Sequence, residues 1–90
     1  PTALSEKRKY LAATTISDYA LFGGGCVNTN TPSAIVDVYD TSLTKTVQTD
    51  LSKARYQLVA TTIGDYALFG GGYTYSTESK SNIVDAYVVA

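Results

Sequence analysis

The residues whose types and spacing are best suited to chemistry are two arginines and two aspartates at matched places in the chain. Arg8 precedes one apolar strand-like segment and Asp37 lies within a later one, and Arg55 and Asp85 repeat this arrangement. A buried aspartate among apolar neighbours needs a partner. We therefore expect two structural ion pairs, Arg8 with Asp37 and Arg55 with Asp85. The alternative is that these side chains form part of a polar ring around the central channel of a larger repeat structure, where they could hold a ligand.

The usual catalytic combinations are excluded because the sequence contains no histidine. Neither a Ser-His-acid triad nor a Cys-His pair can form, and the commonest general base and metal ligand is missing. The single cysteine, Cys26, has Tyr73 as its counterpart in the repeat described below, which favours an inert loop thiol. We expect no enzymatic activity, no cofactor and no metal. An enzyme that uses only carboxylates such as Asp37 and Asp85 is the remaining catalytic alternative.

Three other aspartates lie where the chain is expected to turn. Asp18 follows Ser17 and Asp65 follows Gly64, each between two apolar segments, and Asp40 ends an apolar segment. Short polar side chains satisfy backbone groups in turns. We predict two-residue hairpin turns at the first two sites and a side-chain cap at Asp40. The acids lack the dense spacing of a calcium-binding loop.

An internal repeat positions all of these residues. A shift of 47 places aligns residues 4–25 with residues 51–72, and 16 of the 22 aligned pairs are identical. The match resumes at a shift of 48, where Ile35–Tyr39 meets Ile83–Tyr87. A period of this length with several short strands predicts a propeller blade or another repeat unit.

Each copy is predicted to be all-β, because β-branched and tyrosine residues are frequent and no segment has helical apolar periodicity. The antiparallel strands expected in the first copy are Tyr10–Ile16, Tyr19–Phe22, Ala34–Tyr39 and Leu43–Thr49, with a loop at Cys26–Ser33. The second copy has no counterpart of the polar fourth strand. Residues 1–50 are thus expected to form a four-stranded unit, and residues 51–90 a three-stranded one.

Glycines end the second strand of each copy, at Gly23-Gly24 and at Gly70-Gly71. They permit a close approach of other groups to the backbone. A phosphate cradle is the sharper alternative, but it needs a helix N-terminus, and no helical pattern follows either doublet.

Overall charge and hydropathy restrict the partners. The formal net charge is −1, so nothing indicates nucleic acid or an anionic membrane as a partner. No apolar run approaches the roughly 18 residues of a transmembrane helix, and no signal peptide is visible. The chain starts at Pro1 rather than Met, and we expect a processed or trimmed product or a piece of something longer. The compartment stays open.

Each copy resembles the kelch repeat of β-propellers in four features that follow one another along the chain. They are an arginine, a glycine doublet after an apolar strand, a variable loop and a Val-Asp-x-Tyr stretch. The segments that carry the resemblance are Arg8, Gly23-Gly24 and Val36–Asp40, then Arg55, Gly70-Gly71 and Val84–Tyr87. The resemblance covers nearly the whole chain and implies one blade per copy. Kelch repeats usually have a tryptophan in the fourth strand, where Thr46 stands here. Copper oxidases built on kelch propellers bind copper through histidines, so that activity is not implied.

Two blades cannot close a propeller, which has about four to eight. Apolar side chains of the second strands are expected to line or back two broad exposed faces and to serve assembly; they are Tyr19, Leu21, Phe22, Tyr66, Leu68 and Phe69. Exposed faces of this kind indicate association. We expect head-to-tail self-association, preferring a homotrimer of six blades to a tetramer of eight. The alternatives are a fragment of a longer propeller, or a designed or minimised repeat protein with no independent function.

The loops after the glycines differ most between the copies, and variable loops on a rigid scaffold are the usual recognition sites. The candidate ligand-binding residues are Tyr73, Tyr75, Asn28 and Asn30, which offer aromatic and amide groups to a protein or a glycan. The sequence therefore predicts a non-enzymatic kelch-like propeller scaffold or protein-interaction module. Carbohydrate binding is the alternative.

Overall fold

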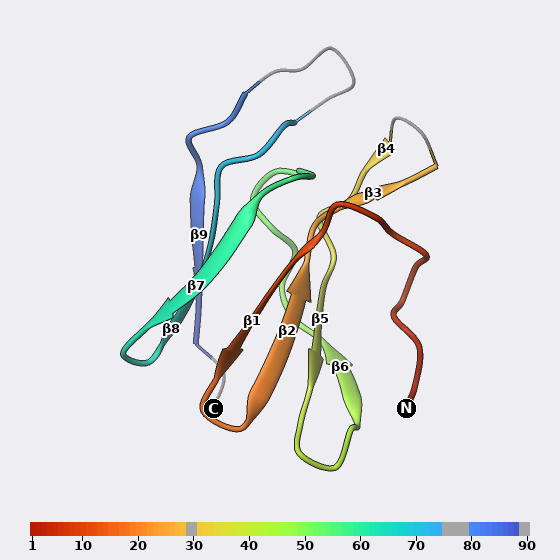
Figure 1. Cartoon of the computed structure of the whole chain (residues 1–90), viewed down its shortest axis with the longest axis vertical. Coiled ribbons are helices and arrows are strands. Elements are labelled where there is room, and N and C mark those ends of the chain that lie inside the picture. The colour runs from red at the N-terminus through yellow and green to blue at the C-terminus, as the bar shows by residue number, and fades with distance from the viewer. Residues whose placement is uncertain (29–30, 75–79, 89–90) are drawn as a thin grey trace.

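The computed structural model describes residues 1–28, 31–74 and 80–88, and every regular element in these residues is a β-strand (Figure 1). The strands are β1 (Ala12–Ile16), β2 (Tyr19–Gly23), β3 (Cys26–Val27), β4 (Thr31–Pro32), β5 (Val36–Tyr39), β6 (Lys45–Val47), β7 (Val59–Ile63), β8 (Tyr66–Gly70) and β9 (Val84–Tyr87). All strand pairs are antiparallel. The predicted all-β class is therefore confirmed.

Each copy of the repeat forms one main sheet. The first copy gives sheet 1, with the order β1-β2-β5-β6, and the second gives sheet 2, with the order β7-β8-β9. The registers correspond: Leu21 pairs with Val38 in sheet 1, and Leu68 pairs with Ala86 in sheet 2. Within the described residues sheet 2 has no fourth strand, so the two copies differ at their outer edges.

Several strand boundaries and one loop differ from the prediction. β1 begins at Ala12, because Tyr10 has a positive φ of 60° that interrupts an extended backbone. β5 begins at Val36 rather than at Ala34. The expected loop Cys26–Ser33 contains the small hairpin β3–β4, which is too short for a sequence pattern to reveal.

The turns lie where the sequence places them. Residues 17–18 and 64–65 connect the two long hairpins, and the first residue of each turn has a positive φ of 53° or 55°. Asp40 Oδ1 accepts hydrogen bonds from the N–H groups of Ser42, at 2.9 Å, and Thr44, at 3.0 Å. The predicted cap at Asp40 is therefore confirmed.

The fourth strand, β6, is shorter than the predicted Leu43–Thr49. It begins at Lys45, because Leu43 has a φ of 63° and belongs to the turn. β6 forms the outer edge of sheet 1, as predicted. In sheet 2 the outer edge strand is β9.

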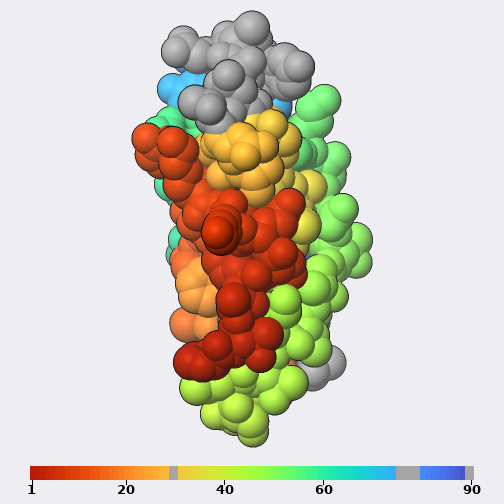
Figure 2. Space-filling view, turned by 90° about the vertical axis from the view of Figure 1, so that its right-hand side faces the viewer, coloured from red at the N-terminus to blue at the C-terminus, as the bar shows by residue number. Residues whose placement is uncertain are grey.

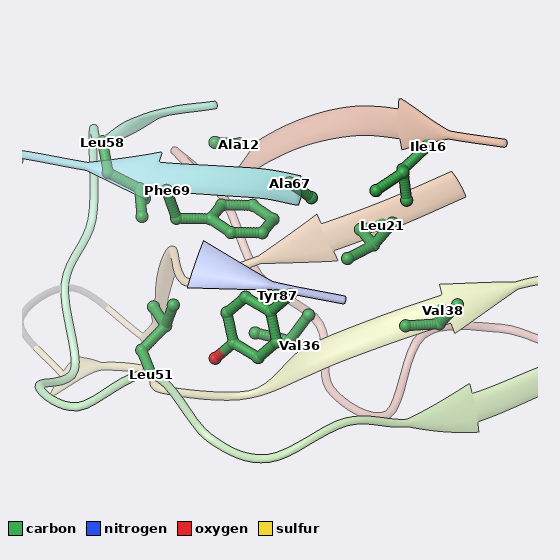
Figure 3. Close-up of a cluster of buried hydrophobic side chains, with 10 residues drawn as sticks. All are labelled: Ala12, Ile16, Leu21, Val36, Val38, Leu51, Leu58, Ala67, Phe69 and Tyr87. Carbon is green, nitrogen blue, oxygen red and sulfur yellow. The ribbon is translucent and has the colours of Figure 1, made fainter. Parts of the chain in front are cut away.

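The two sheets stack in the same orientation. Side chains alternate between the two faces of a strand. We call the face that carries Leu21 in sheet 1 and Leu68 in sheet 2 the front, and the face that carries Phe22 and Phe69 the back. The front of sheet 1 packs against the back of sheet 2 (Figure 3). The buried core residues are Ala12, Ile16, Leu21, Val36, Val38, Leu51, Leu58, Ala67, Phe69 and Tyr87.

This stacking corrects one prediction. Leu21 and Phe69 were expected to line or back an exposed face. Neither lines one, because both are 0% exposed between the sheets, and Tyr19 also packs against this core. Phe22 and Leu68 are half-buried on the two outer faces of the stack. The run Tyr-Ala-Leu-Phe is apolar on both sides of its strand, so its sequence does not indicate which side is covered.

The sheets converge toward their first strands. The backbone of β1 lies close to that of β7 and, less extensively, of β8. Small side chains, Ala12 and the partly buried Ala60, lie on these converging strands. The large rings of Phe69 and Tyr87 fill the space farther out (Figure 3). The two sheets therefore lie closest together at β1 and β7.

Candidate functional site

Arg8 joins three parts of the first repeat. Its Nη1 donates to the carbonyl oxygens of Gly24, at 2.8 Å, and Ile35, at 2.7 Å. Its Nη2 pairs with Asp37 Oδ2 at 2.6 Å, and both side chains are 0% exposed. Ser5 donates its N–H (3.2 Å) and its hydroxyl (2.5 Å) to the same carboxylate. This arginine latch ties the segment before β1 to the end of β2 and to β5.

Arg55 builds the same latch in the second repeat. Its Nη1 donates to the carbonyl oxygens of Gly71, at 3.1 Å, and Ile83, at 2.6 Å. Its Nη2 pairs with Asp85 Oδ2 at 2.6 Å, and the N–H of Ser52 donates to that carboxylate oxygen at 3.2 Å. The predicted ion pairs are therefore both present. The arginine, the glycine doublet and the Val-Asp stretch of each repeat are parts of one hydrogen-bonded unit.

The first latch leaves its carboxylate little freedom for other chemistry, whereas the Asp85 side chain of the second latch is 17% exposed. Asp37 accepts bonds from Arg8 and Ser5, and its burial excludes solvent. β5 and β9, which carry Asp37 and Asp85, are separated by an intervening strand from β1 and β7, where the sheets converge. Both carboxylates therefore lie away from the edge where the two sheets converge. Among the described residues no cluster of three His, Cys, Asp or Glu side chains is arranged to hold a metal ion.

The contact between the sheets centres on Phe69 and Gly23. A Cβ atom on Gly23 would lie 2.8 Å from Cε1 of the Phe69 ring, closer than carbon atoms approach without repulsion. One residue farther along, a Cβ atom on Gly24 would lie 2.8 Å from Leu58 Cδ2 and 3.3 Å from Leu51 Cδ1. The glycine doublet is therefore a socket for side chains from the second repeat.

The front of sheet 2 is an open, apolar face. Its exposed residues include Val59 (72%), Ile63 (67%), Tyr66 (51%) and Val84 (61%). Their counterparts on the front of sheet 1 are Ala12, Ile16, Tyr19 and Val36, which are buried or packed against the core under sheet 2. The two front faces thus occupy corresponding positions of the repeat, and among the described residues only the first is covered by the other sheet.

The back of sheet 1 carries Phe22 and Tyr39 in an edge-to-face contact, with ring centroids 5.8 Å apart and ring planes at 88°. Phe69 and Tyr87 on the back of sheet 2 have the same separation and angle. A mostly apolar groove of about 550 Å³ lies beside Phe22 and Tyr39, bounded also by Leu4 and Leu43. The N-terminal segment, red in Figure 2, runs across this side of the molecule.

Tyr10, Tyr56 and Tyr73 form an aromatic row near the β3–β4 hairpin. Tyr56 and Tyr73 stack with centroids 5.6 Å apart and planes at 30°, and Tyr10 lies 6.4 Å from Tyr56. The Lys9 ammonium lies 5.3 Å from the centroid of the Tyr10 ring. Tyr10 is 51% exposed, so part of the row meets solvent.

The predicted recognition residues are only partly brought together. Tyr73 belongs to the aromatic row, whereas Asn28 is exposed at the end of β3, and no hydrogen bond among the described residues links it to Tyr73. Tyr75 and Asn30 lie outside the described residues. Tyr10 and Tyr56 were not predicted as recognition residues, because neither belongs to the variable loops.

Other contacts within each repeat have a signal that was available in the sequence. Ser5 and Ser52, which bind the latch aspartates, occupy identical positions of the repeat beside Leu4 and Leu51. Cys26, expected in a loop, lies in β3 and is 3% exposed. The backbone N–H of Cys26 donates to the carbonyl of Lys9 at 2.8 Å.

Tyr87 closes the outer part of the interface. Its hydroxyl donates to the carbonyl of Thr49 at 2.8 Å. Burial, together with the negative charges of Asp85 and Asp50, raises the pKa of Tyr87 from 10 to about 12, and Arg55 opposes this shift. Tyr39 makes the equivalent bond to the carbonyl of Thr2, at 2.6 Å.

No protein-family model matches the sequence, and a search of curated proteins finds no match. In the described part of the chain, no helix of sufficient length and hydropathy to span a membrane is present. The described residues thus form two repeated latches, one covered socket, two open faces and an aromatic row.

Proposed function

We propose that the two repeats are consecutive blades of a kelch-like β-propeller that serves as a non-enzymatic scaffold or protein-interaction module. The observation that carries this proposal is the stacking of the front of sheet 1 on the back of sheet 2. A repeat that always presents its back to its neighbour's front can continue indefinitely, and it closes into a ring when the sheets converge on one side.

The latches support the same proposal. Each consumes its charged groups in bonds within its own repeat, so each blade is held together independently of the next. The loops that follow the glycines differ in sequence between the repeats. A rigid blade with variable loops is the usual arrangement of a recognition scaffold.

Imaging a covalently linked array would test the propeller. Three copies joined in one polypeptide through short flexible linkers supply six blades, and electron microscopy of this protein should show a closed ring. An open, rod-like stack of sheets, or sheets that do not stack, would contradict the propeller architecture.

Carbohydrate binding is a second candidate, favoured by the row of Tyr10, Tyr56 and Tyr73. Tyrosine rings pack against the apolar faces of sugars while their hydroxyls form hydrogen bonds. A glycan array should then show binding that Tyr10→Ala and Tyr56→Ala weaken at least tenfold. Tyr66→Ala is the matched control, because Tyr66 and Tyr10 are both 51% exposed, yet Tyr66 lies outside the row. Equal effects of all three substitutions would count against a glycan site on the row.

A further inference from the structure

We infer that the open front of sheet 2 receives the back of sheet 1 from a second copy of this chain, with Phe22 of that copy seated on Gly70. This inference rests on the proposed function, because it assigns the next blade to another molecule. The covered interface inside the chain provides the template: there, Phe69 on the back of sheet 2 is seated on Gly23.

The back face, which would dock on the neighbouring sheet, is the same in both repeats. Three strands of each back carry six matched side chains, and all six are identical in type. The back of sheet 1 carries Ala13, Thr15, Ala20, Phe22, Asp37 and Tyr39, and the back of sheet 2 carries Ala60, Thr62, Ala67, Phe69, Asp85 and Tyr87. The ring pair on each back has the same geometry, 5.8 Å and 88°. The back of sheet 1 is therefore already shaped like a face that the structure shows docked.

The receiving face is also matched. Of the eight front residues on the three shared strands, six are identical between the sheets. The two exceptions exchange alanine and valine in opposite directions: Ala12 corresponds to Val59, and Val38 corresponds to Ala86. The total side-chain volume of the face is thus conserved, which is the condition under which packing is best preserved.

Among the described residues, nothing occupies the socket on sheet 2. A Cβ atom on Gly70 would meet nothing nearer than Val84 Cγ2 at 3.5 Å, whereas one on Gly23 would collide with Phe69 at 2.8 Å. A mostly apolar groove of about 290 Å³ lies over this site, lined in part by Val59, Leu68, Gly70 and Val84. The neighbouring Gly71 would have no contact closer than 3.8 Å.

A second contact fits the same docking. Leu51, in the segment that enters sheet 2, packs against Gly24 and is 4% exposed. Leu4 is its counterpart in the repeat and is half-buried beside the back of sheet 1. When the back of sheet 1 of a second copy lies on the front of sheet 2, Leu4 of that copy comes to Gly71, as Leu51 comes to Gly24.

The two docking surfaces are different, so the contact is heterologous and each can be blocked separately. Gly70→Phe fills the socket, and Phe22→Asp places a charge on the projecting ring. Each variant keeps the other surface intact. Ser42→Phe adds the same ring to an exposed turn and is the matched control for Gly70→Phe. Circular dichroism verifies that all variants are folded.

Light scattering after size exclusion measures the assembly. The wild type and Ser42→Phe should have a mass of about three times the 9.6 kDa chain mass, or a larger multiple of it, and each blocked variant should be a monomer. An equimolar mixture of Gly70→Phe and Phe22→Asp should give a heterodimer that grows no further, because it holds one working contact. A monomeric wild type, an unchanged mass for Gly70→Phe, or a mixture without heterodimer would overturn the inference. A linked array that still forms a ring would leave the proposed function standing.

Discussion

The ring of Phe69 lies directly over the backbone of Gly23, so that a Cβ atom there would be 2.8 Å from the ring. Gly70, the counterpart of Gly23 in the second repeat, has no such cover. One position of the repeat is thus seen once in its docked state and once in its open state. This pair provides an internal comparison for testing how the two sheets associate.

Substitution by alanine should have opposite effects at the two glycines. Gly23→Ala forces the Phe69 ring out of its site and should lower the free energy of unfolding by about 1–3 kcal/mol. Gly70→Ala meets open space and replaces a flexible residue in a strand, so it should be neutral or raise stability by up to about 1 kcal/mol. Urea unfolding at a protein concentration low enough that the wild type and both variants are monomers measures the difference, because assembly would cover Gly70. Equal losses at both positions would show that the cost is one of backbone conformation and not of packing.

Much of the fold follows from the repeat. The hairpins, their turns and the outer position of β6 were predictable, because apolar runs, turn residues and a polar strand each have a local signature. The covered face was not predictable for Leu21 and Phe69. Their strands are apolar on both faces, and only the tertiary stacking distinguishes the buried side.

The candidate site was also predictable only in part. The ion pair between Arg8 and Asp37 follows from the cost of burying an unpaired carboxylate. The bonds from Arg8 to the carbonyl oxygens of Gly24 and Ile35 could not be predicted. Every residue has a backbone carbonyl, and the sequence does not indicate which of them accept a side-chain hydrogen bond. The aromatic row was missed for a related reason: Tyr10 and Tyr56 belong to different repeats and meet only when the sheets stack.

Breaking the first latch should be strongly destabilising. Asp37→Asn leaves the fully buried guanidinium of Arg8 without its counter-charge, and removal of one partner of a buried pair costs about 3–5 kcal/mol. Arg8→Met should cost a similar amount, and the double variant less than the sum of the two, because neither charge is then left unpaired. A double-mutant cycle by urea unfolding tests this coupling. Asp18→Asn, in an exposed turn, should change stability by no more than about 0.5 kcal/mol. Strictly additive losses for Asp37 and Arg8 would argue that the pair is not coupled.

Stability should fall in alkaline solution because of Tyr87. Its pKa in the folded protein is about 12, whereas the ordinary value in an unfolded chain is about 10. Below pH 10 the phenol is neutral in both states. Between pH 10 and 12 the unfolded chain loses the proton first, which favours unfolding.

The free energy of unfolding, measured in urea at pH values from 8 to 11.5, should therefore decrease above pH 10. Tyr87→Phe should be less stable at neutral pH through loss of the bond to Thr49, but its curve should be flatter above pH 10. Parallel curves for the two proteins would exclude Tyr87 as the source.

Exchanging the two hairpin turn residues should transfer stability between the repeats. Ser17 has a φ of 53° and Gly64 has a φ of 55°, a conformation that costs an ordinary L-residue roughly 1–2 kcal/mol. Glycine adopts it without this cost but loses more entropy on folding, so Ser17→Gly should stabilise by about 0.5–1 kcal/mol. Gly64→Ser should destabilise by a similar amount, since a Cβ atom there meets nothing within 4 Å and packing does not contribute. The double exchange should return thermal stability close to that of the wild type. A gain, or a loss, for both single substitutions would show that local contacts, and not the backbone angle, determine the effect.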